Sequence, residues 1–436
     1  MLRRDEMKII GIDIGTTTIS GVVVENGKSI EHETRKNDSF LPTENSWERI
    51  QSPEYIRETA EDIVKTFLQK HPDVQRIGVT GQMHGIVYLN KNGEPQSPLY
   101  TWQDERGNQP YKDDKTYVQC LSEVCGYTLA AGYGLVTHFY NMVNGLVPEA
   151  TAKLCTIHDY IAMSLAGEKT PVTDCTDGAS LGFFDVRNRC FDTSALEKCG
   201  IDTSLLPKLS SGCIGSYKDA DVYAAIGDNQ ASFLGATGGD CNSILINVGT
   251  GSQFSAYTKD YIECEGLETR PFPGGGYLLV GASLCGGRAY ALLENFYRCI
   301  AKAFCDSIDS YYDAMNKLLE EGSKPQDIPE VSPLFQGTRS DPNLRASITG
   351  LSADNFTPRH MTWAMLEGMT KELFDMYEKY RQKAGKENKK LIGSGNGLRK
   401  NPHFQKIVSE KFEMPLFLSD CEEEAAVGAA LYAAMA

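Results

Sequence analysis

Two segments of the chain place a glycine and small hydroxyl residues directly after an apolar run, and this combination suits phosphate binding. They are Asp13–Thr18 and Asn247–Ser252. Glycine lets a ligand approach the backbone closely, while backbone N–H groups and threonine hydroxyls donate hydrogen bonds to phosphate oxygens. Either segment alone could be a strand that ends in an ordinary turn, but two such turns are a more specific signal. The residues predicted to contact phosphate are Gly15, Thr16, Thr17, Gly249, Thr250 and Ser252.

Two acids could supply the chemistry beside these turns. Asp13 would repel phosphate unless a cation lay between them, and Mg²⁺ with oxygen ligands fits that place. Asp228 follows Gly227 and precedes an Ala/Ser/Gly-rich helix predicted over Ala231–Gly239, where the helix dipole favours an ionised carboxylate. An ionised carboxylate can accept the proton of an attacking hydroxyl, although a plain helix N-cap would leave the same pattern. We predict Asp228 as the catalytic base, and Asp13 and Asp228 as metal ligands.

Planar polar side chains and an aromatic ring occur in two further segments. Such groups bind sugars, because they make paired hydrogen bonds and the ring covers the C–H face. One segment ends a predicted strand and the other follows the next hairpin, so both could lie on the same rim. A lone histidine such as His84 is more often a satisfied core residue. The predicted substrate-binding residues are Gln82, Met83, His84, Trp102, Asp104, Arg106, Asp228 and Asn229.

A glycine-rich segment, Gly393–Gly397, follows the apolar pair Leu391-Ile392 and precedes a helix that opens at Asn401-Pro402. A strand, a glycine-rich loop and a helix in this order often hold the base and ribose of a nucleotide, although the segment could be only a connector. The predicted contacts are Gly393, Gly395 and Asn396. A dinucleotide-binding loop is disfavoured, because Phe254 stands where the third glycine of G-x-G-x-x-G belongs.

The elements around these segments predict two similar α/β halves. The opening predicts a three-stranded meander with an Asn26-Gly27 hairpin turn, a helix capped by Ser52, and two more strands. The predicted strands are Lys8–Ile14, Thr18–Val24, Ser29–Thr34, Arg76–Thr80 and Ile86–Leu89, and a later pair, Ser243–Val248 and Phe254–Tyr257, repeats the first strand–turn–strand pattern. Helices are expected over 360–381, from Asn401, and over 422–434. We expect two ribonuclease-H-like domains with a central cleft, divided into 7–237 and 238–436.

Composition excludes several classes of protein. The chain has 436 residues and a formal net charge of −15, and it carries no basic stripe, so we expect neither a nucleic-acid nor a membrane partner. Its 13 cysteines form no C-x-x-C pair, which predicts reduced thiols. No apolar run approaches the roughly 18 residues of a membrane span. We therefore expect a cytoplasmic protein; a homodimer is compatible with the sequence.

Taken together, these segments resemble the FGGY carbohydrate kinase family from about Met7 to the C-terminus. The likeness rests on Gly11–Thr17, Gln82–Gly85, Trp102–Arg106, Gly227–Gln230, Asn247–Ser252, Gly393–Gly397 and Glu424–Ala430. Further segments are similar to the branch of the family that phosphorylates sedoheptulose, namely Thr101–Asp104, Thr156–Tyr160 and Asp177–Phe184.

The resemblance implies the actin/Hsp70/sugar-kinase superfold and the phosphorylation of a sugar hydroxyl by ATP with Mg²⁺. It implies that residues 7–237 bind sugar and phosphate and that residues 238–436 bind the nucleotide. Sedoheptulose is the first candidate substrate, and xylulose or another ketose or polyol is the alternative. Where the family often has a Lys shortly before a Trp, the stretch Leu135–Tyr140 has neither, and this departure bears on the substrate.

Two rival functions remain open at the level of sequence. A non-catalytic, ATP-driven conformational protein of the actin or Hsp70 kind would share the fold, because fold does not fix function. That rival gives no reason for Trp102 beside Gln82, or for an acid such as Asp228. A dehydrogenase is weaker still, for want of a dinucleotide loop.

Overall fold

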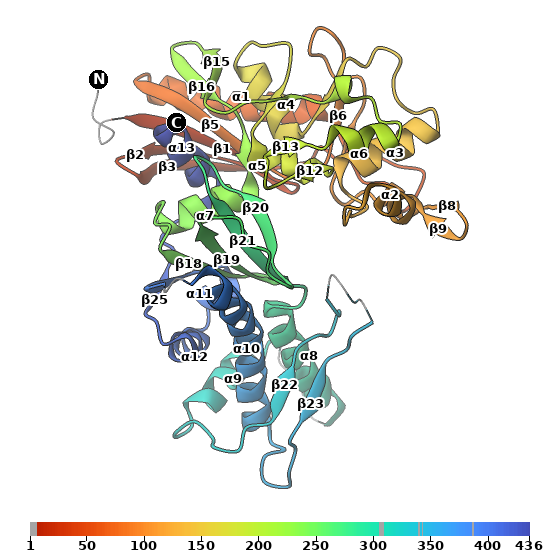
Figure 1. Ribbon diagram of the computed structural model, residues 1–436. Coiled ribbons are helices and arrows are strands. Elements are labelled where there is room, and N and C mark those ends of the chain that lie inside the picture. Colours follow the sequence, from red (N-terminus) through yellow and green to blue (C-terminus); the bar gives the residue numbers. More distant parts are fainter. Residues whose placement is uncertain (1–6, 305–308, 339–340, 342, 386–387) are drawn as a thin grey trace. The chain divides into compact units, whose positions relative to one another are not determined.

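The computed structural model describes residues 7–304, 309–338, 341, 343–385 and 388–436, which form two compact units (Figure 1). Unit 1 contains Met1–Gly239, Arg270–Gly276 and Cys421–Ala436, and unit 2 contains Asp240–Thr269 and Tyr277–Asp420. The sequence predicts a single boundary between residues 237 and 238, whereas each observed unit is made of separate segments of the chain. The division into domains with separate roles stays a prediction.

Unit 1 is built on a mixed sheet in the order β15-β16-β5-β1-β2-β3. An antiparallel meander forms one half, and β5 and β16 add parallel to β1 and to β5. The strands are β1 (Lys8–Ile14), β2 (Thr18–Glu25), β3 (Lys28–Lys36), β5 (Val74–Gly81), β15 (Cys213–Tyr217), β16 (Ala220–Tyr223) and β17 (Ile226–Gly227), which pairs with the end of β5. The predicted meander is confirmed. Asn26 and Gly27 both have positive φ, as the predicted hairpin turn requires.

Two helices cover opposite faces of this sheet (Figure 1). Ser52 accepts a hydrogen bond from the backbone of Tyr55 and so caps α1 (Pro53–Lys70), as predicted; the buried side of α1 packs on β1 and β2. On the other face, α13 (Glu424–Met435) lies directly on β1 and β5. A Cβ on Gly11 would come within 1.9 Å of the carbonyl oxygen of Ala426, so only glycine there admits the helix. This close approach explains why the C-terminal segment belongs to unit 1.

One predicted strand does not join the central sheet. The sequence pattern over Ile86–Leu89 predicts another strand of the first half, but β6 (Val87–Leu89) pairs with β10 (Lys153–Cys155) in a separate two-stranded sheet. The place beside β5 is taken by β16, from much later in the chain. This part of unit 1 also contains α2 (Tyr117–Cys125), α3 (Gly134–Val143), α4 (Ile157–Leu165), α5 (Cys175–Gly178), α6 (Thr193–Lys198) and α7 (Asp228–Thr237).

Unit 2 repeats the central topology of unit 1, in the strand order β20-β21-β19-β18-β24-β25. β18 is antiparallel to β19 and parallel to β24, as β1 is to β2 and β5. The strands are β18 (Ser243–Val248), β19 (Ser252–Thr258), β20 (Glu268–Pro271), β21 (Tyr277–Ser283), β24 (Lys390–Ser394) and β25 (Leu416–Leu418), and the helices are α8 (Gly287–Phe304), α9 (Tyr312–Glu320), α10 (Pro358–Ala384), α11 (Asn396–Arg399) and α12 (Pro402–Phe412). The predicted pair of ribonuclease-H-like halves is thus confirmed in the sheets.

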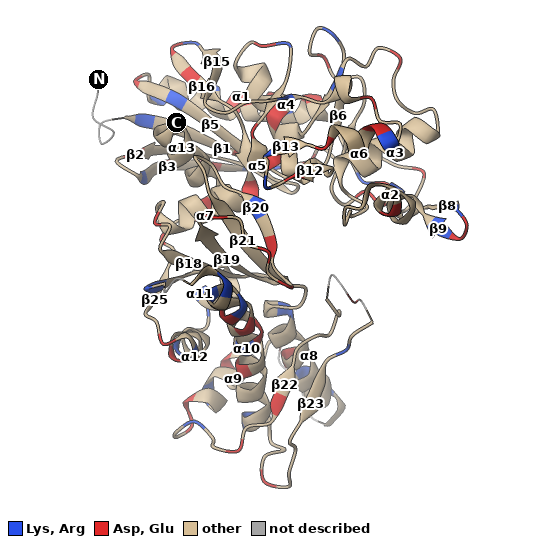
Figure 2. Ribbon diagram, in the orientation of Figure 1, with Lys and Arg blue, Asp and Glu red and all other residues tan. Residues whose placement is uncertain are grey.

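Lys and Arg are interspersed with Asp and Glu along the elements of both units (Figure 2). The cysteines in the described parts of the chain are free thiols. Among the described residues, no helix is both long enough and apolar enough to cross a bilayer.

Candidate active site

The turn between β1 and β2 has its carbonyl groups directed toward the protein. The carbonyl of Gly15 accepts a hydrogen bond from Asn37 Nδ2 at 2.8 Å, and that of Thr16 accepts one from Gln51 Nε2 at 2.9 Å. The carbonyl of Thr17 accepts from Asn37 N at 2.8 Å. In a planar trans peptide the N–H group points away from the C=O group. The N–H groups of Thr16 and Thr17 therefore face the other way, in the arrangement that binds an anion.

A chain of hydrogen bonds connects this turn to the predicted sugar-binding segments. Trp102 Nε1 donates to Thr16 Oγ1 at 3.0 Å, and Thr16 Oγ1 donates to Gln82 Oε1 at 3.2 Å. Gln82 Nε2 in turn donates to Gln51 Oε1 at 2.9 Å. Gln82 is 5% exposed, whereas Trp102 is 47% exposed. Gln82 thus serves to hold the turn between β1 and β2, while about half of the Trp102 side chain stays exposed.

Asp13 lies near the end of β1, just before the turn. Its Oδ1 atom is buried and has no hydrogen-bond partner among the described residues. Burial, followed by the charges of Asp228 and Glu423, raises the pKa of Asp13 to about 7, and His158 opposes this shift. A buried carboxylate oxygen without a partner costs free energy, and a nearby cation would remove that cost. The position therefore suits a bound cation.

The carboxylate groups at and near Asp13 suit Mg²⁺ in particular. In phosphoryl-transfer sites Mg²⁺ is bound by one or two carboxylates and takes its other ligands from phosphates and water. Asp13 and Asp228 are two carboxylates whose charges interact. Within the part of the chain that the structure describes, no group of three or more His, Cys, Asp or Glu side chains is arranged to hold a metal by itself.

Asp228 is the first residue of α7, and Gly227 is the N-cap, in an extended conformation. The helix begins earlier than the predicted Ala231–Gly239 and ends at Thr237. Asp228 is half-buried, and Asn229 Nδ2 donates to its Oδ1 at 2.7 Å. Gly227, not Asp228, is the cap residue, and Asp228 places its acid in the first turn of the helix. The N-cap alternative for Asp228 does not describe this geometry.

The Gln82–His84 segment reaches the residue before Asp228. Met83 is 4% exposed and packs so closely that a Cβ on Gly227 would lie 2.8 Å from Met83 Cε. His84 is half-buried, and its ring stacks on that of Tyr133 with 4.7 Å between ring centroids and 9° between planes. Its φ is +75°, an uncommon value outside glycine that often marks functional positions. The structure thus brings Met83 against the residue that precedes the predicted base.

Asp104 and Arg106 form a buried ion pair, with exposures of 1% and 2%. Arg106 Nε donates to Asp104 Oδ1 at 2.6 Å, and Arg106 Nη1 donates to Asn141 Oδ1 at 2.6 Å. The guanidinium carbon lies 4.1 Å from the centroid of the Tyr100 ring, in a cation–π contact. Direct sugar contact by this pair stays a prediction. In this arrangement the pair fixes the loop that carries Trp102.

The turn between β18 and β19 in unit 2 is anchored by backbone donors from the start of α8. Gly287 N donates to the carbonyl of Gly249, and Arg288 N donates to that of Thr250, each at 3.0 Å. The loop after β24 packs against the same turn. Gly395 has φ +80°, and a Cβ there would lie 2.5 Å from the carbonyl oxygen that ends β18. A side chain at this position would therefore be strained and would clash.

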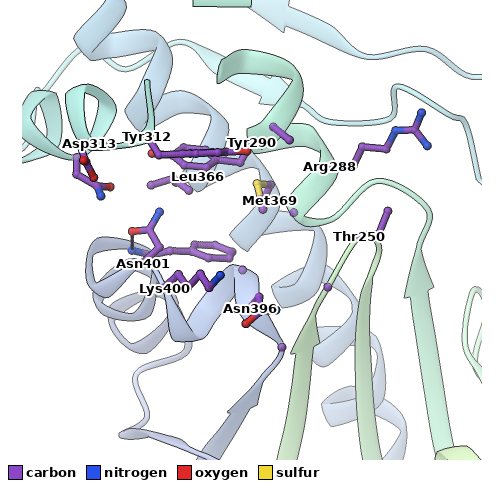
Figure 3. A pocket seen from close by; sticks show the side chains of 17 residues that line it. Thr250, Arg288, Tyr290, Tyr312, Asp313, Leu366, Met369, Asn396, Lys400 and Asn401 are labelled. Atoms are coloured by element: carbon purple, nitrogen blue, oxygen red, sulfur yellow. Dashed lines mark hydrogen bonds between the residues drawn. The ribbon is translucent and has the colours of Figure 1, made fainter. Parts of the chain in front are cut away.

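A cavity of about 980 Å³ lies beside this turn, within unit 2 (Figure 3). Four predicted nucleotide-binding residues line it, namely Gly249, Thr250, Gly395 and Asn396. Two others do not, because Gly393 is buried inside β24 and Ser252 is 7% exposed at the start of β19. The rings of Tyr290 and Tyr312 stack along one wall with 6.0 Å between centroids and 28° between planes.

The two ends of this cavity carry opposite charges (Figure 3). Asp313 lies beside Tyr312 at one end, and Arg288 extends at the other end, next to Thr250. Lys400 lies near Asn396 on the wall between them. A ligand with a flat polar ring at one end and negative charge at the other would match this distribution.

Several residues of the site carried no signal in the sequence. Asn37 and Gln51 are isolated polar residues, and only their positions after β3 and in β4 (Ile50–Gln51) bring them to the turn. Tyr312 and Asp313 belong to a helix without any motif. In the sequence, the pair Gly286-Gly287 at the start of α8 is a hint that the backbone comes close to another segment, which is the turn between β18 and β19.

Comparisons with known proteins agree over the whole chain. The model of the N-terminal domain of the FGGY family of carbohydrate kinases matches residues 8–243, and the model of the C-terminal domain of the same family matches residues 244–436.

Relatives and solved structures of similar length match as well. The sedoheptulokinase of Mus musculus is 25% identical, and the match covers 97% of this chain and 96% of the relative. The xylulose kinase of Lactococcus lactis is also 25% identical, over 98% of this chain and 87% of the relative. The crystal structure of gluconate kinase from Lactobacillus acidophilus is similar with a TM-score of 0.81 at 20% identity, covering 98% of this chain and 89% of that one. This last likeness concerns the fold.

Proposed function

Because the chain belongs to the FGGY family of carbohydrate kinases, we propose that it transfers the γ-phosphoryl group of ATP to a hydroxyl of a ketose, with Asp228 as the base. The observation that supports this most directly is the grouping in unit 1 of an anion-binding turn with two interacting aspartates. An acid beside a phosphate turn needs a cation, and a second acid can take the proton of an alcohol.

On the acceptor side, we assign the sugar to the surfaces of His84, Trp102 and Asn229. The exposed ring of Trp102 can cover the C–H face of a sugar, and the His84 and Asn229 side chains can hydrogen-bond its hydroxyls. Asp228 then holds the reacting hydroxyl and accepts its proton as the phosphoryl group arrives. Asp104 and Arg106 contribute by fixing the loop of Trp102.

Asp13 and Asp228 would hold Mg²⁺ at the phosphate turn. The ion, when bound, would neutralise negative charge on the transferring phosphoryl group. The turn itself supplies the N–H groups of Thr16 and Thr17 for phosphate oxygens. Catalysis in this proposal is mainly positioning and charge stabilisation, because phosphoryl transfer needs little covalent help from the protein.

On the donor side, we assign ATP to the cavity of unit 2. Its phosphates fit the end with Thr250 and Arg288, because that end offers an exposed turn and a guanidinium. Its base fits the end with Tyr312 and Asp313, where a carboxylate can accept a hydrogen bond from an exocyclic amine. Use of ATP and free thiols both suit the cytoplasm.

Among ketoses, we rank sedoheptulose first and xylulose second. The relatives that match nearly the whole chain are named for these two sugars, and the motifs Thr156–Tyr160 and Asp177–Phe184 favour the first. The test is a coupled assay of ADP release over a panel of ketoses, aldoses and polyols. We expect ADP release to depend on a ketose, with sedoheptulose giving the highest kcat/KM.

Two outcomes of that screen would contradict the proposal. ADP release at the same rate with and without sugar would favour a conformational ATPase of the actin or Hsp70 kind. Release stimulated only by polyols or aldoses would remove the ketose assignment while leaving the kinase activity.

A further inference from the structure

A buried polar segment, Asp174–Ser180, touches both the turn of the proposed base and the sugar-binding segment. It comprises α5 and the 3₁₀ turn Ala179–Leu181 that follows. At one end, the backbone N–H of Gly227 donates to Thr176 Oγ1 at 3.2 Å, immediately before Asp228. At the other end, the backbone N–H of His84 donates to Ser180 Oγ at 3.2 Å. Neither hydroxyl faces solvent, because Thr176 is 1% exposed and Ser180 is 4% exposed.

Ser180 and His84 are joined by two hydrogen bonds. The ring nitrogen Nδ1 of His84 lies 2.8 Å from the carbonyl oxygen of Ser180, in addition to the backbone bond to the Ser180 hydroxyl. The two bonds fix the backbone and the ring of one residue at once. They also help to maintain the unusual positive φ of His84, which the chain would not adopt without outside support.

Asp177 makes the segment rigid from its centre. Ser180 Oγ donates to Asp177 Oδ1 at 3.1 Å, and Thr156 Oγ1 donates to Asp177 Oδ2 at 2.6 Å. His158 Nε2 lies 2.8 Å from the same oxygen, and neither side chain of that pair is exposed. Burial would raise the pKa of Asp177, but the charge of His158 and the hydrogen bonds from His158 and Thr156 outweigh it and lower the pKa. A buried, ionised carboxylate that accepts hydrogen bonds from two hydroxyl groups is a stiff anchor.

The turn before Asp228 is fixed from the sheet as well. Thr80 Oγ1 donates to the carbonyl of Ile226 at 2.7 Å, and β17 pairs with the end of β5. Thr80 and Thr176 therefore hold the two polar groups of a single peptide, the one between Ile226 and Gly227. Between them they define where the first residue of α7 begins.

We propose that Thr176 and Ser180 are positioning residues, which tie the turn of Asp228 and the backbone of His84 to one buried anchor and so align the base with its sugar hydroxyl. The inference rests on the proposed function, because it assumes that Asp228 and His84 serve one acceptor. Neither Thr176 nor Ser180 touches the substrate. Each acts through the residue that it holds.

The expected effects differ between the two residues. Thr176→Val keeps the shape but leaves the buried N–H of Gly227 without an acceptor, so the turn must shift to find another partner. A displacement of about 1 Å at a catalytic group can cost about 100-fold in rate. We therefore expect kcat to fall about tenfold or more, with little change in the KM for sugar. Thr176→Ser keeps the hydroxyl and should restore most of kcat.

Ser180→Ala acts on the sugar side. It removes one hydrogen bond to His84 and one to Asp177, but it leaves Asp228 and Gly227 untouched. Loss of a single hydrogen bond that holds a binding residue predicts a rise in the KM for sugar of about three- to tenfold. The change in kcat should be smaller than for Thr176→Val. The KM for ATP should stay the same in both variants.

Thr173→Val is a matched control for a purely structural role. Thr173 is a fully buried threonine of the same part of the chain, and its hydroxyl bonds the carbonyl of Asp174 at 3.5 Å. Its loss should lower Tm about as much as the loss of the Thr176 hydroxyl, with kcat and both KM values near wild type.

The experiment measures kcat, both KM values and Tm for wild type and five variants. The variants are Thr176→Val, Thr176→Ser, Ser180→Ala, Thr173→Val and Asp228→Asn. The inference is supported if Thr176→Val loses kcat, Thr176→Ser recovers it, and Ser180→Ala raises the KM for sugar. It is overturned if Thr176→Val and Thr173→Val have the same kinetics while Asp228→Asn still loses kcat. Unimpaired turnover in Asp228→Asn would instead overturn the proposed function itself.

Discussion

The two units present the same strand–turn–strand frame, but they carry different residues at one position near the end of the first strand. In unit 1, Asp13 lies opposite Ser20 on β2 and Thr80 on β5. In unit 2, Asn247 has the matching place, opposite Gln253 on β19 and Ser394 on β24. An acid in one frame is thus a neutral amide in the other.

The carbonyl groups of the two turns also accept hydrogen bonds from different kinds of donor, with the same effect on the direction of the turn peptides. In unit 1, the side chains of Asn37 and Gln51 bind the turn carbonyls. In unit 2, the backbone at the start of α8 binds the carbonyls of Gly249 and Thr250. Either way the carbonyls are occupied and the opposite sides of the peptides are left for an anion. In our proposal, phosphate binding therefore belongs to the frame that both units share, whereas cation binding and proton transfer belong to unit 1.

The largest expected effect comes from removing the base of unit 1. Asp228→Asn keeps the shape and should lower kcat by about 100-fold or more, the usual scale for a general base. Binding of the sugar, measured by calorimetry, should change much less. Asp221→Asn, an exposed aspartate of β16, is the matched control and should behave as wild type. A kcat near wild type in Asp228→Asn would mean that the acid in unit 1 is not the base.

Removing the other acid should act on the metal. Asp13→Asn makes the unit 1 turn resemble that of unit 2, and we expect the Mg²⁺ concentration for half-maximal activity to rise about tenfold or more. The measurement is a Mg²⁺ titration of initial rate at saturating ATP and sugar. An unchanged titration would show that Asp13 does not hold the ion, and the two turns would then be equivalent in this respect.

The pH dependence of the Mg²⁺ requirement also tests whether Asp13 holds the ion. Burial and the neighbouring acids raise the pKa of Asp13 to about 7, so the carboxyl is largely ionised at pH 8 and largely protonated at pH 6. A proton and a cation compete for it, so the apparent Mg²⁺ affinity should fall about tenfold between pH 8 and pH 6. Titrations at both pH values test this. The pH dependence of the apparent Mg²⁺ affinity should disappear in Asp13→Asn. If the dependence persists in that variant, a group other than Asp13 causes it.

The smallest expected effect comes from the converse substitution in unit 2. Asn247→Asp gives the second turn an acid that lacks a cation partner. Gly249 and Thr250 of this turn are exposed, and at the dielectric constant of bulk water one like charge about 4 Å from phosphate costs about 1 kcal/mol. We expect the KM for ATP to rise about fivefold, and the Mg²⁺ requirement to stay the same. A fall in the Mg²⁺ requirement would instead mean that both turns can hold a cation.

Local patterns sufficed to predict the strands and turns that carry the site. The pattern over Lys8–Ile14 gave β1 with the observed bounds, and Ser52 caps its helix as predicted. Glycine and hydroxyl residues predicted a turn after β1 and after β18, and both turns are present; phosphate binding by these turns stays a prediction. These features are local, so periodicity and residue type determine them.

The remaining features depend on contacts between distant parts of the chain. The ion pair of Asp104 and Arg106 is buried because Tyr100 and Asn141 surround it, and no local pattern announces that. The C-terminal helix joins unit 1 because Gly11 admits it, across more than 400 residues of sequence. The pairing of β6 with β10, rather than with the central sheet, likewise depends on contacts between distant segments.

The central claim is that the acid in unit 1 directs phosphoryl transfer to a sugar hydroxyl, and product analysis tests it most directly. Wild type and Asp228→Asn are incubated with ATP, Mg²⁺ and sedoheptulose or xylulose, and both ADP and sugar phosphate are quantified by mass spectrometry. The account predicts one sugar phosphate for each ADP in wild type, with both nearly absent in Asp228→Asn. ADP without sugar phosphate, or undiminished sugar phosphate in the variant, would contradict it.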